Sequence, residues 1–121
     1  MKFITFILLT ASILCPGCAE VIGRPDVDVV IVNRSSHTLS NADAQFGEYL
    51  CEWGTVIPSA TKGFGLFPHP ITSDTTLHWW ENERGQRSEK LDLRKIYPAR
   101  AAGRLTFTFT DDGVKADFKK E

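Results

Sequence analysis

The residues best suited to metal or catalytic chemistry are few and widely spaced in this sequence. Beyond the apolar N-terminal segment they are His37, His69, His78 and Cys51. These four show neither the His-x-His nor the Cys-x-x-Cys spacing with which short segments hold a metal ion. A copper site of the cupredoxin type needs a histidine soon after its cysteine, and the first histidine after Cys51 is His69. We therefore expect no metal ion and no other cofactor.

A serine, a histidine and an aspartate do lie near one another, at Ser35, His37 and Asp43. Many hydrolases hold such a serine in a Gly-x-Ser-x-Gly turn, and that motif is missing around Ser35. Serine and histidine in a polar turn also need no catalytic explanation. The sequence therefore predicts that the protein is not an enzyme, and a small hydrolase is the weakest of the alternatives.

The three tryptophans are the best candidates for ligand binding. Trp53, Trp79 and Trp80 would stack on sugar rings or dock a partner if they were exposed, and would be large core residues if they were buried. Strand alternation places Leu77 and Trp79 on one face and His78 and Trp80 on the other. Because Leu77 marks the inner face, Trp80 is expected to be more exposed than Trp79.

The first 19 residues have the features of an export signal. Lys2 precedes the apolar run Phe3 to Leu14, which is followed by the helix-breaking residues Pro16 and Gly17. As a helix, the apolar run would span about 18 Å, whereas a bilayer core is about 30 Å thick. The segment therefore predicts export of the chain and not a permanent transmembrane helix.

Two processing routes are open at the end of this segment. Gly17-Cys18-Ala19 fits ordinary signal cleavage, which would release a soluble secreted or periplasmic chain that begins at Glu20. The run Leu14 to Cys18 instead resembles the lipobox of bacterial lipoproteins, with Gly17 matching the pattern and Cys15 standing where leucine is usual. The resemblance implies that Cys18 is acylated and that lipid chains hold the protein at a membrane of the cell envelope.

The remainder of the chain has the size and charge of one small domain. We expect a short linker over residues 20–26 and a single domain over 27–121. Across the whole sequence, 14 basic residues stand against 15 acidic residues, for a net charge of −1. This balance gives no electrostatic reason to expect a nucleic-acid partner.

Two residues of this domain have both a structural and a chemical interpretation. Cys51 is the only cysteine after Cys18, so it has no partner for an internal disulfide and is expected to be a buried apolar residue. An intermolecular thiol is the alternative.

Asn33-Arg34-Ser35 is a glycosylation sequon, which would matter in a eukaryotic secretory pathway.

Short runs of alternating apolar and polar residues, separated by turn residues, predict an all-β domain. The clearest is a hairpin in which Leu105, Phe107 and Phe109 alternate with threonines before the turn Asp111-Asp112-Gly113. Seven strands are expected, over 27–33, 44–53, 61–67, 75–82, 87–93, 104–110 and 114–119. This pattern favours a seven-stranded antiparallel immunoglobulin-like β-sandwich, and a small open β-barrel is the alternative.

The sequence thus indicates a location more clearly than an activity. We expect an exported, membrane-tethered bacterial lipoprotein with a non-catalytic binding or assembly role, whose partner is an envelope protein or a glycan. The alternative is a soluble secreted β-sandwich that binds a glycan or another ligand through the tryptophans.

Overall fold

Every regular element in the described part of the chain is a β-strand. The computed structural model describes residues 20–98 and 100–121. Its strands are β1 (Val21–Gly23), β2 (Val27–Asn33), β3 (Leu39–Phe46), β4 (Tyr49–Val56), β5 (Thr61–Phe67), β6 (Ile71–Thr72), β7 (Asp74–Glu81), β8 (Gly85–Asp92), β9 (Gly103–Thr110) and β10 (Gly113–Lys120).

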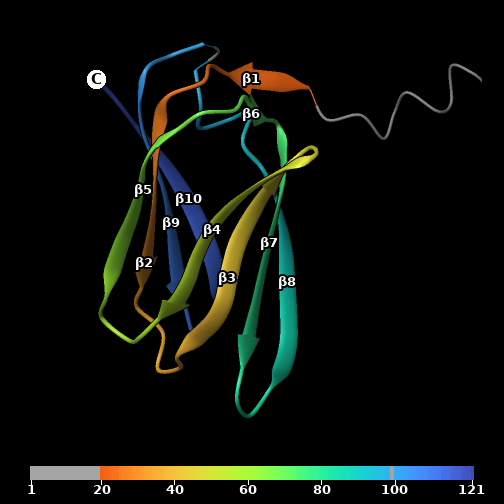
Figure 1. The fold of residues 1–121 in the computed structure, drawn as a ribbon, viewed down its shortest axis with the longest axis vertical. Coiled ribbons are helices and arrows are strands. Elements are labelled where there is room, and N and C mark those ends of the chain that lie inside the picture. The colour runs from red at the N-terminus through yellow and green to blue at the C-terminus, as the bar shows by residue number, and fades with distance from the viewer. Residues whose placement is uncertain (1–19, 99) are drawn as a thin grey trace, which may run out of the picture.

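Two four-stranded sheets pack face to face, as Figure 1 shows. One sheet has the order β10-β9-β2-β5 and the other has the order β4-β3-β7-β8. The short strands β1 and β6 pair with each other across one end of the molecule. The sheets remain separate, so the all-β sandwich is confirmed and the barrel alternative is not. The pairing differs from the expected antiparallel pattern at one place, because β2 and β9 run parallel.

The described residues form ten strands, so the expected number of seven was too low. β2 and β5 have the predicted bounds at both ends. The single strand expected over 44–53 is in fact the hairpin of β3 and β4, which reverses at Gly47 and Glu48. Gly47 has a φ of +63°, a conformation in which glycine avoids the strain of a side chain.

The structure has a strand in the segment 20–26, where a short linker was expected. Strand β1 lies within it and is held in place by Ser73, whose N–H donates to the Glu20 carbonyl at 2.6 Å and whose Oγ accepts from the Glu20 N–H at 3.2 Å. A side chain at Gly23 would meet the Cβ of Ile71 at 2.6 Å and the hydroxyl of Tyr97 at 2.7 Å. The chain is therefore packed against the domain from Glu20 onward.

The core lies between the two sheets and is filled by the inward-facing residues of each strand. Phe46 from one sheet and Phe67 from the other have ring centroids 5.4 Å apart, and both side chains are fully buried. Along β9, Leu105, Phe107 and Phe109 face inward as predicted. At about 25 cal/mol per Å² of buried apolar surface, this packing is the main force that stabilises the domain.

Asn33 is a polar residue of this interior. Its side-chain N–H groups donate to the carbonyls of His37 at 2.8 Å and Val56 at 2.9 Å, and its Oδ1 accepts from the N–H of Ser35 at 2.9 Å. The link to Val56 crosses from β2 of one sheet to β4 of the other. Asn33 is fully buried, so its amide is not accessible for glycosylation in the folded domain.

Candidate functional site

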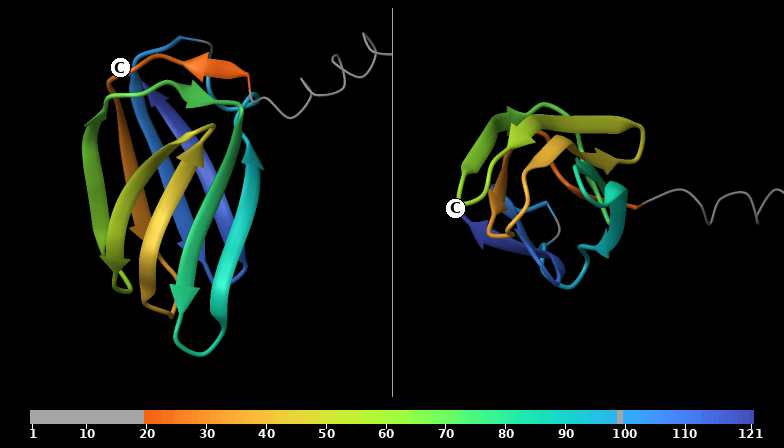
Figure 2. Two further views of the ribbon diagram at one scale, coloured as in Figure 1. Left: turned by 45° about the vertical axis from the view of Figure 1, so that its right-hand side comes forward. Right: turned by 90° about the horizontal axis from the view of Figure 1, so that it is seen from below.

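The outer face of the β4-β3-β7-β8 sheet carries a recess at one end. In the left view of Figure 2 this sheet lies in front of the other one. A groove of about 820 Å³ lies at the end of this sheet nearest β1 and β6. Gln45 of β3, Thr76 of β7 and Lys90 of β8 are cross-strand neighbours, and all three line it.

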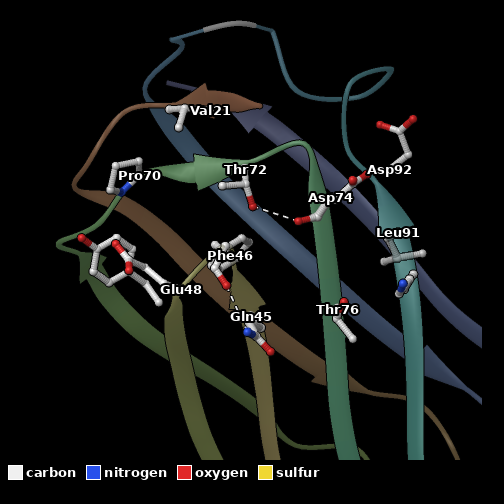
Figure 3. A pocket seen from close by; sticks show the side chains of 13 residues that line it. Val21, Gln45, Phe46, Glu48, Pro70, Thr72, Asp74, Thr76, Leu91 and Asp92 are labelled. Atoms are coloured by element: carbon white, nitrogen blue, oxygen red, sulfur yellow. Dashed lines mark hydrogen bonds between the residues drawn. The ribbon is translucent and has the colours of Figure 1, made fainter. Parts of the chain in front are cut away.

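The walls of the groove come from segments that are far apart in the sequence. Val21 of β1 and Thr72 of β6 lie at one end (Figure 3). Gly47 in the β3–β4 turn also lines the groove. The Gln45 side chain donates to the Gly47 carbonyl at 3.0 Å, and the Thr72 hydroxyl donates to the Asp74 carbonyl at 2.8 Å. These bonds tie both groups to the backbone of the wall.

The charged residues of the groove are mostly acidic. Glu48, Asp74 and Asp92 line it together with one base, Lys90. Hydrogen bonds from the side chain and backbone of Arg94 lower the pKa of Asp92 to about 2. The Asp92 carboxylate is therefore ionised throughout the neutral range and paired with Arg94 at 2.7 Å, so Glu48 and Asp74 against Lys90 leave the groove slightly negative.

Further along β7, an exposed tryptophan and a buttressed histidine continue this outer face. His78 Nδ1 lies 2.8 Å from Asp43 Oδ1, with 32% of the histidine side chain and 22% of the aspartate side chain exposed. Trp80 is 38% exposed and is flanked by Ser40 of β3 and Gln86 of β8. Asp74, Thr76, His78 and Trp80 alternate along one strand, so the groove and the indole belong to one face.

The structure does not bring the three tryptophans together on one surface. Trp79 is buried against Phe109, with centroids 4.9 Å apart, and its indole N–H donates to Glu81 at 3.2 Å. Trp53 is buried against Phe107, with centroids 6.0 Å apart. Of the three residues predicted for ligand binding, Trp80 alone is accessible, as the alternation along β7 indicated.

The serine, histidine and aspartate considered for hydrolysis are likewise separate. The Ser35 hydroxyl donates to Asn33 Oδ1 at 2.6 Å within the turn after β2. Asp43 contacts His78 on the outer face of the sheet, and not His37. Ser35 therefore bonds within a turn, and Asp43 pairs with His78 at the surface.

Of the two cysteines with predicted roles, Cys51 lies within the described residues and Cys18 does not. Cys51 is fully buried, and burial, followed by the nearby carboxylates of Asp43 and Glu52, raises the pKa of its thiol to about 12. This confirms the expected core cysteine and leaves no accessible thiol there for an intermolecular bond. Cys18 and the rest of the signal segment lie outside the described residues, so lipidation stays a prediction.

Within residues 20–98 and 100–121, no three histidine, cysteine, aspartate or glutamate side chains are placed to hold a metal ion. The same part of the chain contains no helix with the length and apolar content needed to span a bilayer.

Comparisons with known proteins identify a similar fold and nothing more specific. The sequence matches no protein-family model, and no curated protein matches it. An NMR structure of a protein from Eubacterium rectale is similar, with a TM-score of 0.52 over 81% of this chain and 92% of that chain. The sequence identity is 6%, so this likeness concerns the fold alone.

Proposed function

We propose that the protein is an exported bacterial lipoprotein, anchored at the cell envelope through Cys18, with a non-catalytic binding or assembly role. The observation that carries the proposal is the lipobox-like run Leu14 to Cys18, which ends directly before the folded domain. Cys18 precedes Glu20 by two residues, a length of chain that spans at most about 7 Å. Glu20 is itself bonded to Ser73 through both its N–H and its carbonyl.

This arrangement would give the anchored domain a defined orientation. The anchor would leave the domain at β1, and Val21 of β1 also lines the groove. The groove would then open close to the membrane surface, and the Trp80 end of the same face would point away from it. Two or more acyl chains on Cys18 would suffice for stable anchoring, since each buried CH₂ contributes about 0.8 kcal/mol.

A soluble secreted or periplasmic binding protein is the second candidate. Ordinary cleavage after Ala19 would produce it, and the exposed indole of Trp80 beside a groove favours a ligand-binding role in this form as well. The two candidates share the binding face and differ only in the anchor.

Metabolic labelling tests the anchor directly. The full chain is produced in a bacterial host fed a labelled fatty acid, alongside the variants Cys18→Ala, Cys15→Ala and Cys51→Ala. We expect label and membrane association in the wild type, loss of both in Cys18→Ala, and their retention in the other two variants. An unlabelled wild-type chain with an N-terminus at Glu20 would overturn the proposal in favour of the soluble form.

A further inference from the structure

The surface around Trp80 combines one exposed aromatic ring with polar neighbours. The indole is 38% exposed, and its cross-strand neighbours Ser40 and Gln86 are polar. His78, which shares this face, is held by Asp43 at 2.8 Å. A flat aromatic ring therefore stands among polar side chains, of which His78 and Asp43 hold each other in position.

This composition fits a sugar better than a protein surface. A protein interface has an apolar, fully desolvated centre, which a single ring among polar side chains does not supply. A pyranose ring offers one apolar C–H face to an indole and hydroxyl groups around its rim to serine, glutamine, histidine and aspartate. The exposed apolar residues Ile57, Phe64 and Leu66 lie outside this face, on β5 and its connection to β4. On the face itself, Val21 and Tyr49 line the groove and Leu50 pairs with Gln45, so the apolar side chains other than Trp80 gather at the groove end.

The length and charge of the face indicate the kind of saccharide. Trp80 and Asp74 are six residues apart on β7, a separation of about 20 Å along the strand, and Asp74 already lies in the groove. A chain of several sugar rings along β7 would contact both. Arg94 neutralises Asp92 through an ion pair at 2.7 Å, so the remaining Glu48 and Asp74 against Lys90 leave the groove with a small negative charge, which favours a neutral polysaccharide over an anionic one.

We propose that the outer face of β7 is a saccharide-binding site, in which a neutral polysaccharide chain stacks one ring on Trp80 and extends past His78 and Asp43 into the groove. The proposal rests on the binding role inferred above and is independent of the lipid anchor. Trp80 supplies apolar contact, and the Asp43–His78 pair supplies oriented hydrogen bonds to hydroxyl groups.

The experiment uses the mature protein in detergent, with chitin and cellulose particles as insoluble probes and chitohexaose and cellohexaose in calorimetry. We expect binding of at least one of these neutral probes by the wild type, and a loss of affinity of about tenfold or more in Trp80→Ala, as for a central aromatic anchor. Trp80→Phe should retain part of the affinity. Asp43→Ala should weaken binding less than Trp80→Ala does.

Phe64→Ala is the matched control, because Phe64 is an aromatic residue of similar exposure on the other sheet. Its binding should equal that of the wild type. Three results would overturn the proposal: no binding of any of the four probes, equal binding by Trp80→Ala and the wild type, or self-association of the wild type that Trp80→Ala abolishes. None of them bears on the anchor, which fatty-acid labelling decides separately.

Discussion

The inner and outer faces of β7 differ sharply in what surrounds two adjacent tryptophans. Trp79 points into the sandwich, where its ring meets the edge of Phe109 and its N–H reaches Glu81. Trp80 points out of the sheet toward solvent and lies between two polar neighbours on adjacent strands. One residue step along the strand thus separates a side chain that stabilises the fold from one that is free to contact a ligand.

We therefore expect the two faces of β7 to have different roles, one in stability and one in binding. The inner residues of β7, among them Thr75 and Leu77, are fully buried, so changes there act first on stability. The outer residues Thr76, His78 and Trp80 are partly exposed, so changes there can alter binding while the fold persists. Measurements that separate stability from binding therefore test the assignment of each face.

The largest expected effect is the loss of stability when Trp79, the inward-facing tryptophan of β7, is replaced. Trp79→Ala should lower the free energy of unfolding by about 3–5 kcal/mol, because it opens a cavity beside Phe109 and removes the donor to Glu81. Trp80→Ala should lower it by no more than about 1 kcal/mol. Urea unfolding followed by circular dichroism measures both. Equal losses for the two variants would contradict the division between the faces.

A smaller loss of stability is expected when the Asn33 side chain, which links the two sheets by a hydrogen bond, is removed. Asn33→Ala should destabilise the domain by about 2–3 kcal/mol, because the buried carbonyl of Val56 and the carbonyl of His37 lose their donor. Ser35→Ala removes only the hydroxyl that donates to Asn33 and serves as the milder control. If Asn33→Ala unfolds at the same urea concentration as the wild type, the interior of the sandwich does not depend on this amide.

The sequence predicted those elements that are long enough to alternate. β2 and β5 were predicted with their bounds, and the orientation of Trp79 and Trp80 followed from period-two alternation anchored by Leu77. β1 and β6 have three and two residues, too few to display a period, and their pairing depends on contacts between distant segments. No local pattern could have predicted them.

The missed turn between β3 and β4 did leave a signal. Buried residues occupy the even positions 42, 44 and 46 before the turn and the odd positions 51 and 53 after it, a change of phase that a regular strand cannot show. Gly47 lies at this change, while the apolar Leu50 on the outer face hid it. This turn supplies one wall of the groove, so the groove was beyond prediction once the turn was missed.

The smallest effect concerns Cys51, an inner residue whose contribution is visible only at high pH. Burial raises the pKa of its thiol from the ordinary value of 9.0 to about 12, so the unfolded chain releases this proton first as the pH rises. The contribution of the neutral thiol is therefore complete below pH 9 and declines as the pH rises toward 12. The thermal midpoint of the wild type should fall more between pH 8 and pH 10 than that of Cys51→Ala. The variant retains Tyr97, whose pKa is also raised by burial, so the difference between the two proteins reports on the Cys51 thiol. Parallel midpoints for the two proteins would indicate that the thiol at Cys51 is hydrated and not part of the inner face.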